Sequence, residues 1–435
     1  MAAWTSVFRL NLQVSGFRLQ TNLISQQNAN IVNSGLTDHV SGYELRKFWP
    51  LYRELRSPVT PADNMIRSSV GNLKVFRHFA TAMKHDAFGE PHKVLRVEAY
   101  DQLSSLGAGD VHIQFLAAPI NPSDINMIQG VYGVVAKLPA VGGNEGVAIV
   151  VEVGNSVRGF AAGDWVIPFR SGFGCWRTNA VASEDELIKI SKDIPASYAA
   201  SLSVNPATAY RLLRDFGQLK AGDVIMQNGA NSMVGLAVIQ IARLMGIKTI
   251  NIIRSNRPMA GKMLKLLSDL GGDVNVFDEQ VNTPAFHTTL GNYPPCRLAF
   301  NCIGGDATTN MIRCLAPGGT VVTYGGMSKR TLTVPVDVLT AKQLRLEGFW
   351  MAKWYEDNGA LEKKKMMEEI VHMVRQRNLT FFYDLYDFKD FNAALAKSQE
   401  EYNFKKIILD FGVMPPDLSF DDKSIRLLKE YQFIE

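Results

Sequence analysis

The stretch Asp223-Val-Ile-Met-Gln-Asn-Gly-Ala-Asn-Ser-Met-Val-Gly235 decides the fold of this chain. Its first residues are apolar enough for a buried strand, and its middle holds the small residues of a tight turn. The apolar segment Leu236–Met245 then continues a helix, and Thr249–Ile253 is expected to form a second strand. A strand, a turn, a helix and a strand in this order predict a parallel βαβ unit that binds a dinucleotide.

The turn departs from the usual glycine-rich phosphate loop. Gly235 stands where a third glycine lets the helix pack closely against the strand, but Ala230 and Ser232 replace the two earlier glycines. Small residues still let a pyrophosphate approach, and the Ser232 hydroxyl lies at a helix N-terminus, which attracts anions. Read alone, the turn fits an ordinary strand–turn–helix connection equally well.

Arg254 directly follows the second strand, at the position that selects the cofactor. NAD-binding units usually carry Asp or Glu there to bind the ribose 2′-hydroxyl. A guanidinium instead pairs with a 2′-phosphate, and Arg257 follows close behind. The sequence therefore predicts NADPH as the cofactor.

Composition and charge narrow the function classes. The chain has 435 residues, 46% of them hydrophobic, which is enough for two or three packed domains. It lacks the run of about 18 apolar residues that a membrane span needs. Its four cysteines have no metal-ligand spacing, which is typical of a reducing compartment. Because residues 1–80 carry a net charge of +5 and the whole chain +4, the basicity lies in the N-terminal segment and does not indicate nucleic-acid binding.

The N-terminal segment has the composition of a mitochondrial transit peptide. No acidic residue precedes Asp38, and Arg9 and Arg18 lie among Ser, Gln, Asn, Leu and Phe. We expect a transit peptide and N-terminal extension over residues 1–80 and a location in the mitochondrial matrix. An extension without a targeting role is the alternative.

Three further regions follow in the chain. Residues 81–204 are rich in short strands separated by Gly and Pro, which predicts a small barrel-like β domain. Residues 205–350 alternate strands and helices, which predicts a doubly wound parallel sheet of the α/β class. Residues 351–435 are expected to return to the first domain through the strand Lys406–Phe411 and to end in a C-terminal tail.

Two helical segments and the tail add detail to this outline. Ala199–Phe216 is predicted to be mostly helical, and Lys363–Arg375 is predicted to form a basic helix. The tail, Pro415–Glu435, places apolar residues at helical spacing, which predicts a helix that caps either the fold or a partner.

The order of these modules resembles the medium-chain dehydrogenase/reductase superfamily over residues 81–411. Asn121-Pro-Ser-Asp124 lies where that superfamily has its early active-site loop, and Gly163-Asp-Trp-Val166 matches its GDxV turn. Gly142-Gly-Asn-Glu-Gly146 resembles its GHE segment with the histidine replaced. Zinc-dependent members would have Cys or His in these segments, and zinc prefers sulfur and imidazole ligands. We therefore expect no metal.

Within the zinc-free branch, the chain resembles the mitochondrial enoyl thioester reductase group. The segments that carry this resemblance are Asn121–Gly133, Val204–Tyr210, Gln227–Gly235 and Gly348–Trp350. The resemblance implies a GroES-like, strand-rich catalytic domain beside a Rossmann domain. It also implies NADPH-dependent reduction of trans-2-enoyl thioesters, carried on acyl carrier protein or CoA, in mitochondrial fatty acid synthesis, by a homodimer. A zinc-free quinone or alkenal reductase, and a non-catalytic binding protein on the same fold, are the alternatives.

The same resemblance assigns roles to single residues. Tyr132 is the implied proton donor to the α-carbon, since a phenol stays protonated at neutral pH; an ordinary turn tyrosine is the alternative. Trp350 is expected beside the cofactor, or else as a core aromatic. Asn205 is expected to contact the cofactor, or else to cap a helix. Lys406 either reaches the cofactor or lies on the surface.

The other implied cofactor contacts follow the predicted strands. They are Asn231, Ser232, Met233, Val234, Arg254, Ser255, Asn256, Tyr324, Gly325, Gly326, Met327, Phe349 and Met351.

Overall fold

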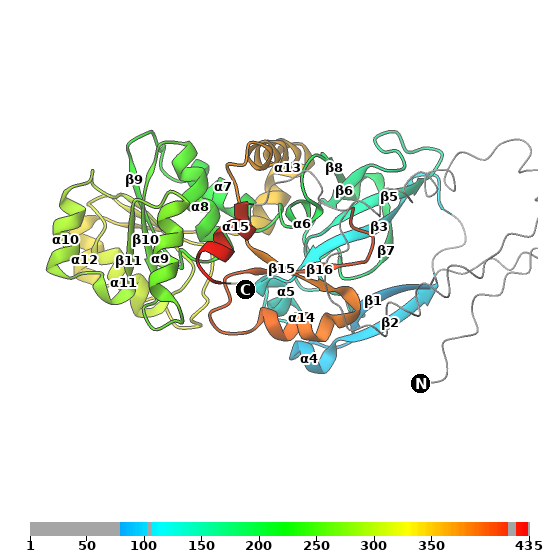
Figure 1. The fold of residues 1–435 in the computed structure, drawn as a ribbon, viewed down its shortest axis with the longest axis horizontal. Helices are drawn as coiled ribbons and strands as arrows, with labels where there is room; N and C mark the ends of the chain where they lie inside the picture. Colours follow the sequence, from blue (N-terminus) through cyan, green and yellow to red (C-terminus); the bar gives the residue numbers. More distant parts are fainter. Residues whose placement is uncertain (1–78, 102–105, 416–422, 434–435) are drawn as a thin grey trace, which may run out of the picture. The chain divides into compact units, whose positions relative to one another are not determined.

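The computed structural model describes residues 79–101, 106–415 and 423–433 (Figure 1). The predicted transit peptide, and all of the extension before residue 79, lie outside these residues. The described strands form three sheets. None of the described helices combines the length and the apolarity that crossing a bilayer requires.

A six-stranded parallel sheet forms the Rossmann module. Its order is β11 (Val274–Phe277), β10 (Lys248–Ile253), β9 (Val224–Asn228), β12 (Leu298–Asn301), β13 (Thr320–Thr323) and β14 (Arg345–Gly348). The helices of this part of the chain are α7 (Asn205–Asp215), α8 (Met233–Leu244), α9 (Ala260–Asp269), α10 (Pro284–Gly291), α11 (Gly305–Arg313) and α12 (Val336–Lys342).

Both faces of the six-stranded sheet are covered, as a doubly wound sheet requires. Ile225 and Phe300 pack in one core cluster with residues of α7 and α8. Met226 and Ala299, their neighbours along the same strands, pack in a second cluster with residues of α10 and α11. Because alternate strand residues point to opposite faces, the near-continuous apolar strands fill both layers.

A seven-stranded sheet forms the strand-rich module. It runs β15 (Tyr383–Asp387), β16 (Lys406–Asp410), β3 (Asp110–Pro119), β5 (Val147–Val153), β6 (Trp165–Pro168) and β8 (Leu187–Ile190), and β7 (Asn179–Ser183) pairs with β3. A smaller sheet contains β2 (Arg96–Asp101), β1 (Phe79–His85) and β4 (Ala140–Val141). The helices here are α4 (Pro91–Val94), α5 (Pro122–Ile128), α6 (Ala196–Ala200), α13 (Met351–Arg375) and α14 (Phe391–Ser398).

The chain returns to the strand-rich module after the Rossmann strands. β16 pairs in an antiparallel register with β3, where Ile408 lies opposite Pro119, and in parallel with β15. Two sequence segments separated by the whole Rossmann module therefore share one sheet (Figure 1).

The two predicted helical segments are present, but their limits differ. Most of Ala199–Phe216 is helical, as predicted, but the segment is divided between the end of α6 and α7, because Pro206 near the start of α7 cannot continue a preceding helix. α13 begins at Met351, well before the predicted start at Lys363, and it bends at Gly359, whose φ is 76°. Lys363 is buried rather than on a basic surface, and its Nζ donates to the carbonyl of Pro168 at 2.9 Å.

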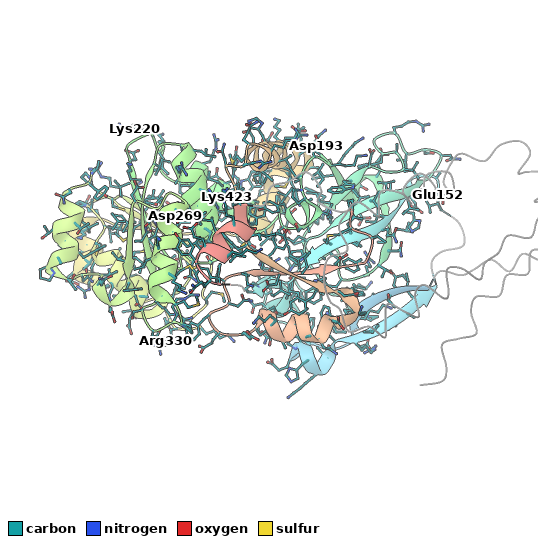
Figure 2. The ribbon with its side chains drawn as sticks, in the orientation of Figure 1. Glu152, Asp193, Lys220, Asp269, Arg330 and Lys423 are labelled. Carbon is teal, nitrogen blue, oxygen red and sulfur yellow. The ribbon has the colours of Figure 1, made fainter. Side chains whose placement is uncertain are left out.

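The C-terminal tail caps the fold through helix α15 (Lys423–Glu430). Leu427, Leu428 and Tyr431 are buried in a cluster with residues of α9, and the Tyr431 hydroxyl donates to Asp269 at the end of that helix. Figure 2 labels Asp269 and Lys423, the first residue of α15. The predicted helical spacing thus marks a helix that packs on this chain's own Rossmann module.

Candidate active site

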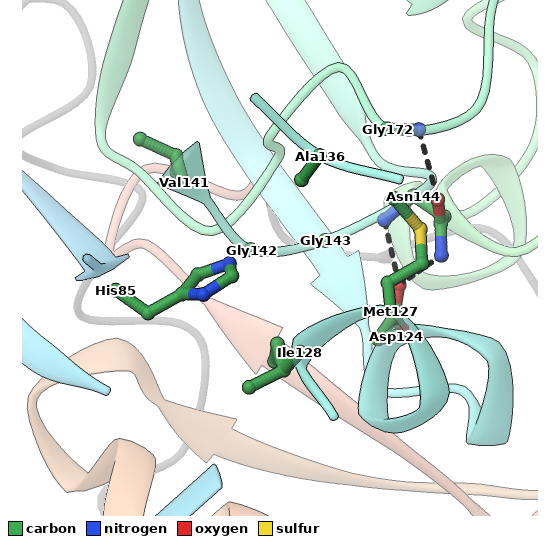
Figure 3. A pocket seen from close by; sticks show the side chains of 10 residues that line it. All are labelled: His85, Asp124, Met127, Ile128, Ala136, Val141, Gly142, Gly143, Asn144 and Gly172. Atoms are coloured by element: carbon green, nitrogen blue, oxygen red, sulfur yellow. Dashed lines mark hydrogen bonds between the residues drawn. The ribbon is translucent and has the colours of Figure 1, made fainter. Parts of the chain in front are cut away.

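The segments that resemble the early loop and the GHE element meet in a buried polar corner. The Asp124 carboxylate accepts from the Asn121 amide at 2.6 Å, from the Asn144 amide at 2.7 Å and from the Asn144 side chain at 2.7 Å. The Asn144 side-chain oxygen accepts in turn from the Gly172 amide at 2.8 Å. Figure 3 shows Asn144 between Asp124 and Gly172. These bonds fix the start of α5 against the loop that precedes β5.

Glu145 and Lys406 complete this corner. Asn121 donates to one Glu145 oxygen at 2.9 Å, and the Val204 amide donates to the other at 2.9 Å. Lys406 donates to the Asn121 side-chain oxygen at 2.6 Å. Burial raises the pKa of Asp124 to about 6 and that of Glu145 to about 7, while burial lowers the pKa of Lys406. Lys406 is therefore neither free nor on the surface, and any contact with a cofactor remains a prediction.

The donor chemistry of the corner agrees with the expectation of a zinc-free site, which stays a prediction. Asn121, Asp124 and Asn144 bond to one another, so their oxygens already have partners. Zinc prefers thiolate and imidazole ligands in a tetrahedron. Within the part of the chain that the structure describes, no three His, Cys, Asp or Glu side chains are grouped closely enough to hold a metal.

A small pocket lies beside this corner and next to the segment that carries Tyr132. Apolar side chains of Met127, Ile128, Ala136 and Val141 line it together with His85, whose Nδ1 lies 3.1 Å from the Ala87 carbonyl (Figure 3). The pocket lining is mixed, with apolar side chains on one part and His85 and the Asp124–Asn144 pair on another.

Tyr132 and Trp350 meet across the two modules, although 218 positions separate them in the sequence. The indole Nε1 of Trp350 donates to the Tyr132 hydroxyl at 2.7 Å, and the rings meet edge to face with centroids 5.5 Å apart. A Cβ on Gly133 would lie 2.6 Å from the indole ring, so the absence of a side chain there lets the tryptophan approach. The structure thus brings together two residues that the sequence named separately.

The electrostatics of Tyr132 suit a proton donor. Burial raises the pKa of its hydroxyl above the ordinary value, and the bond from Trp350 offsets this by lowering it. The phenol is therefore protonated at neutral pH. Because Trp350 donates to the oxygen, the hydroxyl hydrogen stays free to point elsewhere. This geometry favours the proton-donor role over that of an ordinary turn tyrosine, and the role itself remains a prediction.

Most of the predicted cofactor residues gather at one edge of the Rossmann sheet. They follow the carboxyl ends of four parallel strands: Asn231–Val234 after β9, Arg254–Asn256 after β10, Tyr324–Met327 after β13, and Phe349–Met351 after β14. In open α/β sheets this is the edge where ligands bind. Phe349 also packs edge to face against Phe216, with centroids 5.8 Å apart.

The turn after β9 packs the start of α8 closely against the end of the strand, as the third glycine of a dinucleotide-binding turn allows. A Cβ on Gly235 would lie 2.5 Å from the Ala230 carbonyl oxygen, so only glycine fits there. Ser232 caps α8 by accepting from the Gly235 amide at 3.1 Å. The N-terminus of α8 lies at this edge of the sheet, where the helix dipole favours an anion.

The surroundings of Asn205 favour a contact with a ligand over a role as a helix N-cap. It is the first residue of α7, whose cap is Val204, so the N-cap alternative was wrong. Its side-chain oxygen is buried and has no partner among the described residues. A buried unpaired acceptor costs roughly 1–3 kcal/mol, which a bound amide donor would recover. The turn at Gly235 and this unpaired oxygen are both compatible with a bound dinucleotide.

Sequence reasoning missed two contributors to this region. Glu145 was named only as part of the GHE-like segment, yet it joins the polar corner to the start of α7. Tyr402 was not singled out, yet it contacts Arg254 and Arg257. For Glu145 the available signal was its place in the GHE-like segment, whereas no local pattern marks Tyr402.

Comparisons with known proteins identify both modules. The family model described as "Alcohol dehydrogenase GroES-like domain" matches residues 107–192, and the model described as "Zinc-binding dehydrogenase" matches residues 234–370. The enoyl-[acyl-carrier-protein] reductase, mitochondrial, of Rattus norvegicus is 47% identical over 329 residues, which cover 75% of this chain and 88% of that protein.

Solved structures agree with these matches. The mitochondrial 2-enoyl thioester reductase Etr1p/Etr2p heterodimer from Candida tropicalis superposes with a TM-score of 0.70 at 32% identity, covering 77% of this chain and 100% of that one. An Etr1p complex with NADP and crotonyl-CoA gives the same TM-score, identity and coverage.

Proposed function

The chain belongs to the mitochondrial enoyl-[acyl-carrier-protein] reductases of the medium-chain dehydrogenase/reductase superfamily, and on that premise we propose that its active site lies where Tyr132 meets Trp350. The enzyme reduces trans-2-enoyl thioesters with NADPH. The observation that carries the assignment of the site is the 2.7 Å bond from Trp350 to the Tyr132 hydroxyl, beside the loops after β13 and β14.

NADPH supplies the hydride that the β-carbon of the substrate accepts. The charge that then develops toward the thioester oxygen and the α-carbon must be met by hydrogen-bond donors of the protein. Tyr132 donates its proton to the α-carbon, and Trp350 holds the phenol oxygen so that the hydroxyl hydrogen faces the substrate. With Trp350 covering Gly133, the two aromatic rings also exclude water from this side of the reacting centre.

The cofactor contacts extend from this pair along the sheet edge. The unpaired side-chain oxygen of Asn205 accepts a hydrogen bond from an amide of the cofactor, and the N-terminus of α8 attracts the pyrophosphate. Arg254 is exposed at the end of β10 and supplies the charge for the 2′-phosphate. The other predicted contacts belong to the same four loops.

We propose a homodimer that forms at β14. β14 is the edge strand of the six-stranded sheet, and all four of its residues are exposed. Leu346 on β14 is 45% exposed and Val336 on α12 is 73% exposed. An exposed edge with apolar side chains favours pairing with a second copy of the chain. The heterodimer of the Candida tropicalis enzymes supports an assembly of two such chains.

We further propose acyl carrier protein as the physiological carrier, the matrix as the compartment, and residues 1–80 as the transit peptide and N-terminal extension. The names of the relatives support the carrier, and the basic, acid-poor N-terminal sequence supports the import signal. We also propose that residues 81–204, 205–350 and 351–435 divide the rest of the chain as the sequence predicted.

The proposed function is tested by following the oxidation of NADPH and NADH in the presence of crotonyl-CoA, with a quinone as the competing acceptor. We expect turnover of the thioester with NADPH and little turnover with NADH or with the quinone. Turnover of the quinone alone would make the protein a quinone reductase. Binding of NADPH without turnover of either acceptor would make it a binding protein on this fold.

A further inference from the structure

Tyr402 reaches the end of β10 from a distant part of the sequence. It lies between α14 and β16, in the segment that returns to the strand-rich module. The Arg254 guanidinium lies over its ring, 4.9 Å from the centroid. The backbone of Tyr402 is left-handed, with φ at 67°, so the loop holds this residue in a conformation that tyrosine rarely adopts. Strained backbone conformations of this kind cluster at ligand-binding and active sites.

The second contact of Tyr402 is with Arg257. One terminal nitrogen of Arg257 donates to the Tyr402 carbonyl at 2.8 Å. The Arg257 Nε is buried and has no partner among the described residues. A single residue thus holds two guanidinium groups, one through its ring and the other through its backbone.

The two arginines bring their positive charges to the end of β10. Burial, and next the charge of Arg254, lower the pKa of Arg257, which places the two cations within electrostatic reach of each other. Neither arginine has a carboxylate partner among the residues that the structure describes. The nearby acids bond to Ser255: Glu279 accepts from the Ser255 hydroxyl at 3.0 Å, and Asp278 accepts from the Ser255 amide at 3.1 Å. Two guanidiniums that have no carboxylate partner favour a doubly charged oxyanion.

We propose that Tyr402 is a positioning residue for the cofactor, and that it holds Arg254 and Arg257 together so that both bind the 2′-phosphate of NADPH. This inference rests on the proposed use of Arg254 in the cofactor site. It also explains how Arg257 takes part although it stands three positions after Arg254 in the sequence. The Tyr402 carbonyl holds the Arg257 guanidinium at the same residue that Arg254 contacts.

The test measures binding of adenosine 2′,5′-bisphosphate and of 5′-AMP to the full chain by titration calorimetry. The informative variant is Tyr402→Asn, because asparagine tolerates a left-handed backbone while removing the ring. Tyr402→Phe is the matched control, since it keeps the ring under Arg254. We expect Tyr402→Asn to weaken binding of the bisphosphate roughly fivefold, as the loss of a cation–π contact implies, and to leave 5′-AMP unchanged. We expect Tyr402→Phe to bind both ligands as the wild type does.

A double-mutant cycle separates positioning from a general effect on the fold. In an Arg254→Ala background, Tyr402→Asn should cause no further loss of bisphosphate binding, because its effect acts through Arg254. Equal losses for the bisphosphate and for 5′-AMP, or full additivity with Arg254→Ala, would overturn the inference. A wild type that binds the bisphosphate no better than 5′-AMP would overturn the proposed NADPH site as well. A clear preference in the wild type that Tyr402→Asn leaves intact would overturn the role of Tyr402 alone. None of these measurements depends on turnover of a thioester.

Discussion

Replacing Trp350 with phenylalanine isolates the hydrogen bond that orients Tyr132. The change keeps an aromatic ring near Gly133 but removes the Nε1 donor that lies 2.7 Å from the phenol oxygen. A bond between neutral groups contributes about 0.5–1.5 kcal/mol, which corresponds to a roughly two- to tenfold loss of kcat if it acts in the transition state. The bond from Trp350 also lowers the pKa of Tyr132, so its removal raises that pKa.

The pH dependence gives this prediction a second readout. Activity requires the protonated phenol and is lost as the pH rises through the pKa of Tyr132. A higher pKa in Trp350→Phe therefore moves the basic limb of the kcat profile to higher pH. The assay follows NADPH oxidation with saturating crotonyl-CoA from neutral to alkaline pH.

Trp354→Phe is the matched control for this experiment. Trp354 lies one helical turn later and stacks with Arg211, whose guanidinium carbon is 4.5 Å from the ring centroid, and it makes no hydrogen bond to Tyr132. If Trp350→Phe left both kcat and the basic limb unchanged, or if Trp354→Phe shifted them equally, Tyr132 would not be oriented in the proposed way.

Three further predictions concern the corner, the aromatic pair and the dimer. Burial raises the pKa of Glu145 to about 7, so its contribution to the free energy of unfolding is full at acidic pH and is lost as the pH rises from about 4.5 through 7. Glu145→Gln should lower the free energy of unfolding by about 1–3 kcal/mol. Urea unfolding at several pH values should also show that this variant loses less stability than the wild type over the same pH range. Gly133→Ala places a methyl group 2.6 Å from the Trp350 ring and should lower kcat/KM about tenfold or more. An unchanged rate would mean that the ring is free to move aside. Leu346→Arg should shift the protein from dimer to monomer in sedimentation, whereas an unchanged dimer would place the interface away from β14.

Local patterns made much of the fold predictable. The strand, turn and helix around Gly235 lie within one short segment, so their apolar pattern and small residues were visible in the sequence. Arg254 could be named because its role depends only on its place at the end of a strand. The edge strand β14 was not predicted as a strand, because its four residues are all exposed and show no buried face.

Contacts across the chain account for what the sequence could not predict. Tyr132 and Trp350 were each named, but their hydrogen bond joins positions 218 apart. Tyr402 lies 145 positions from Arg257 and acts partly through its carbonyl, a group that every residue possesses. The burial of Lys406 could not be predicted either, because a lysine next to Lys405 is typical of a surface. Its hydrogen bond to Asn121 joins distant parts of the sequence.

The most direct test of the active site is the steady-state kinetics of Tyr132→Phe with NADPH and crotonyl-CoA. This variant keeps the ring beside Trp350 and removes only the hydroxyl. The account predicts that kcat falls by roughly 10²–10⁴, the usual contribution of a general acid, while the affinity for NADPH stays unchanged. A kcat within about twofold of the wild type would contradict the account and move proton transfer away from Tyr132.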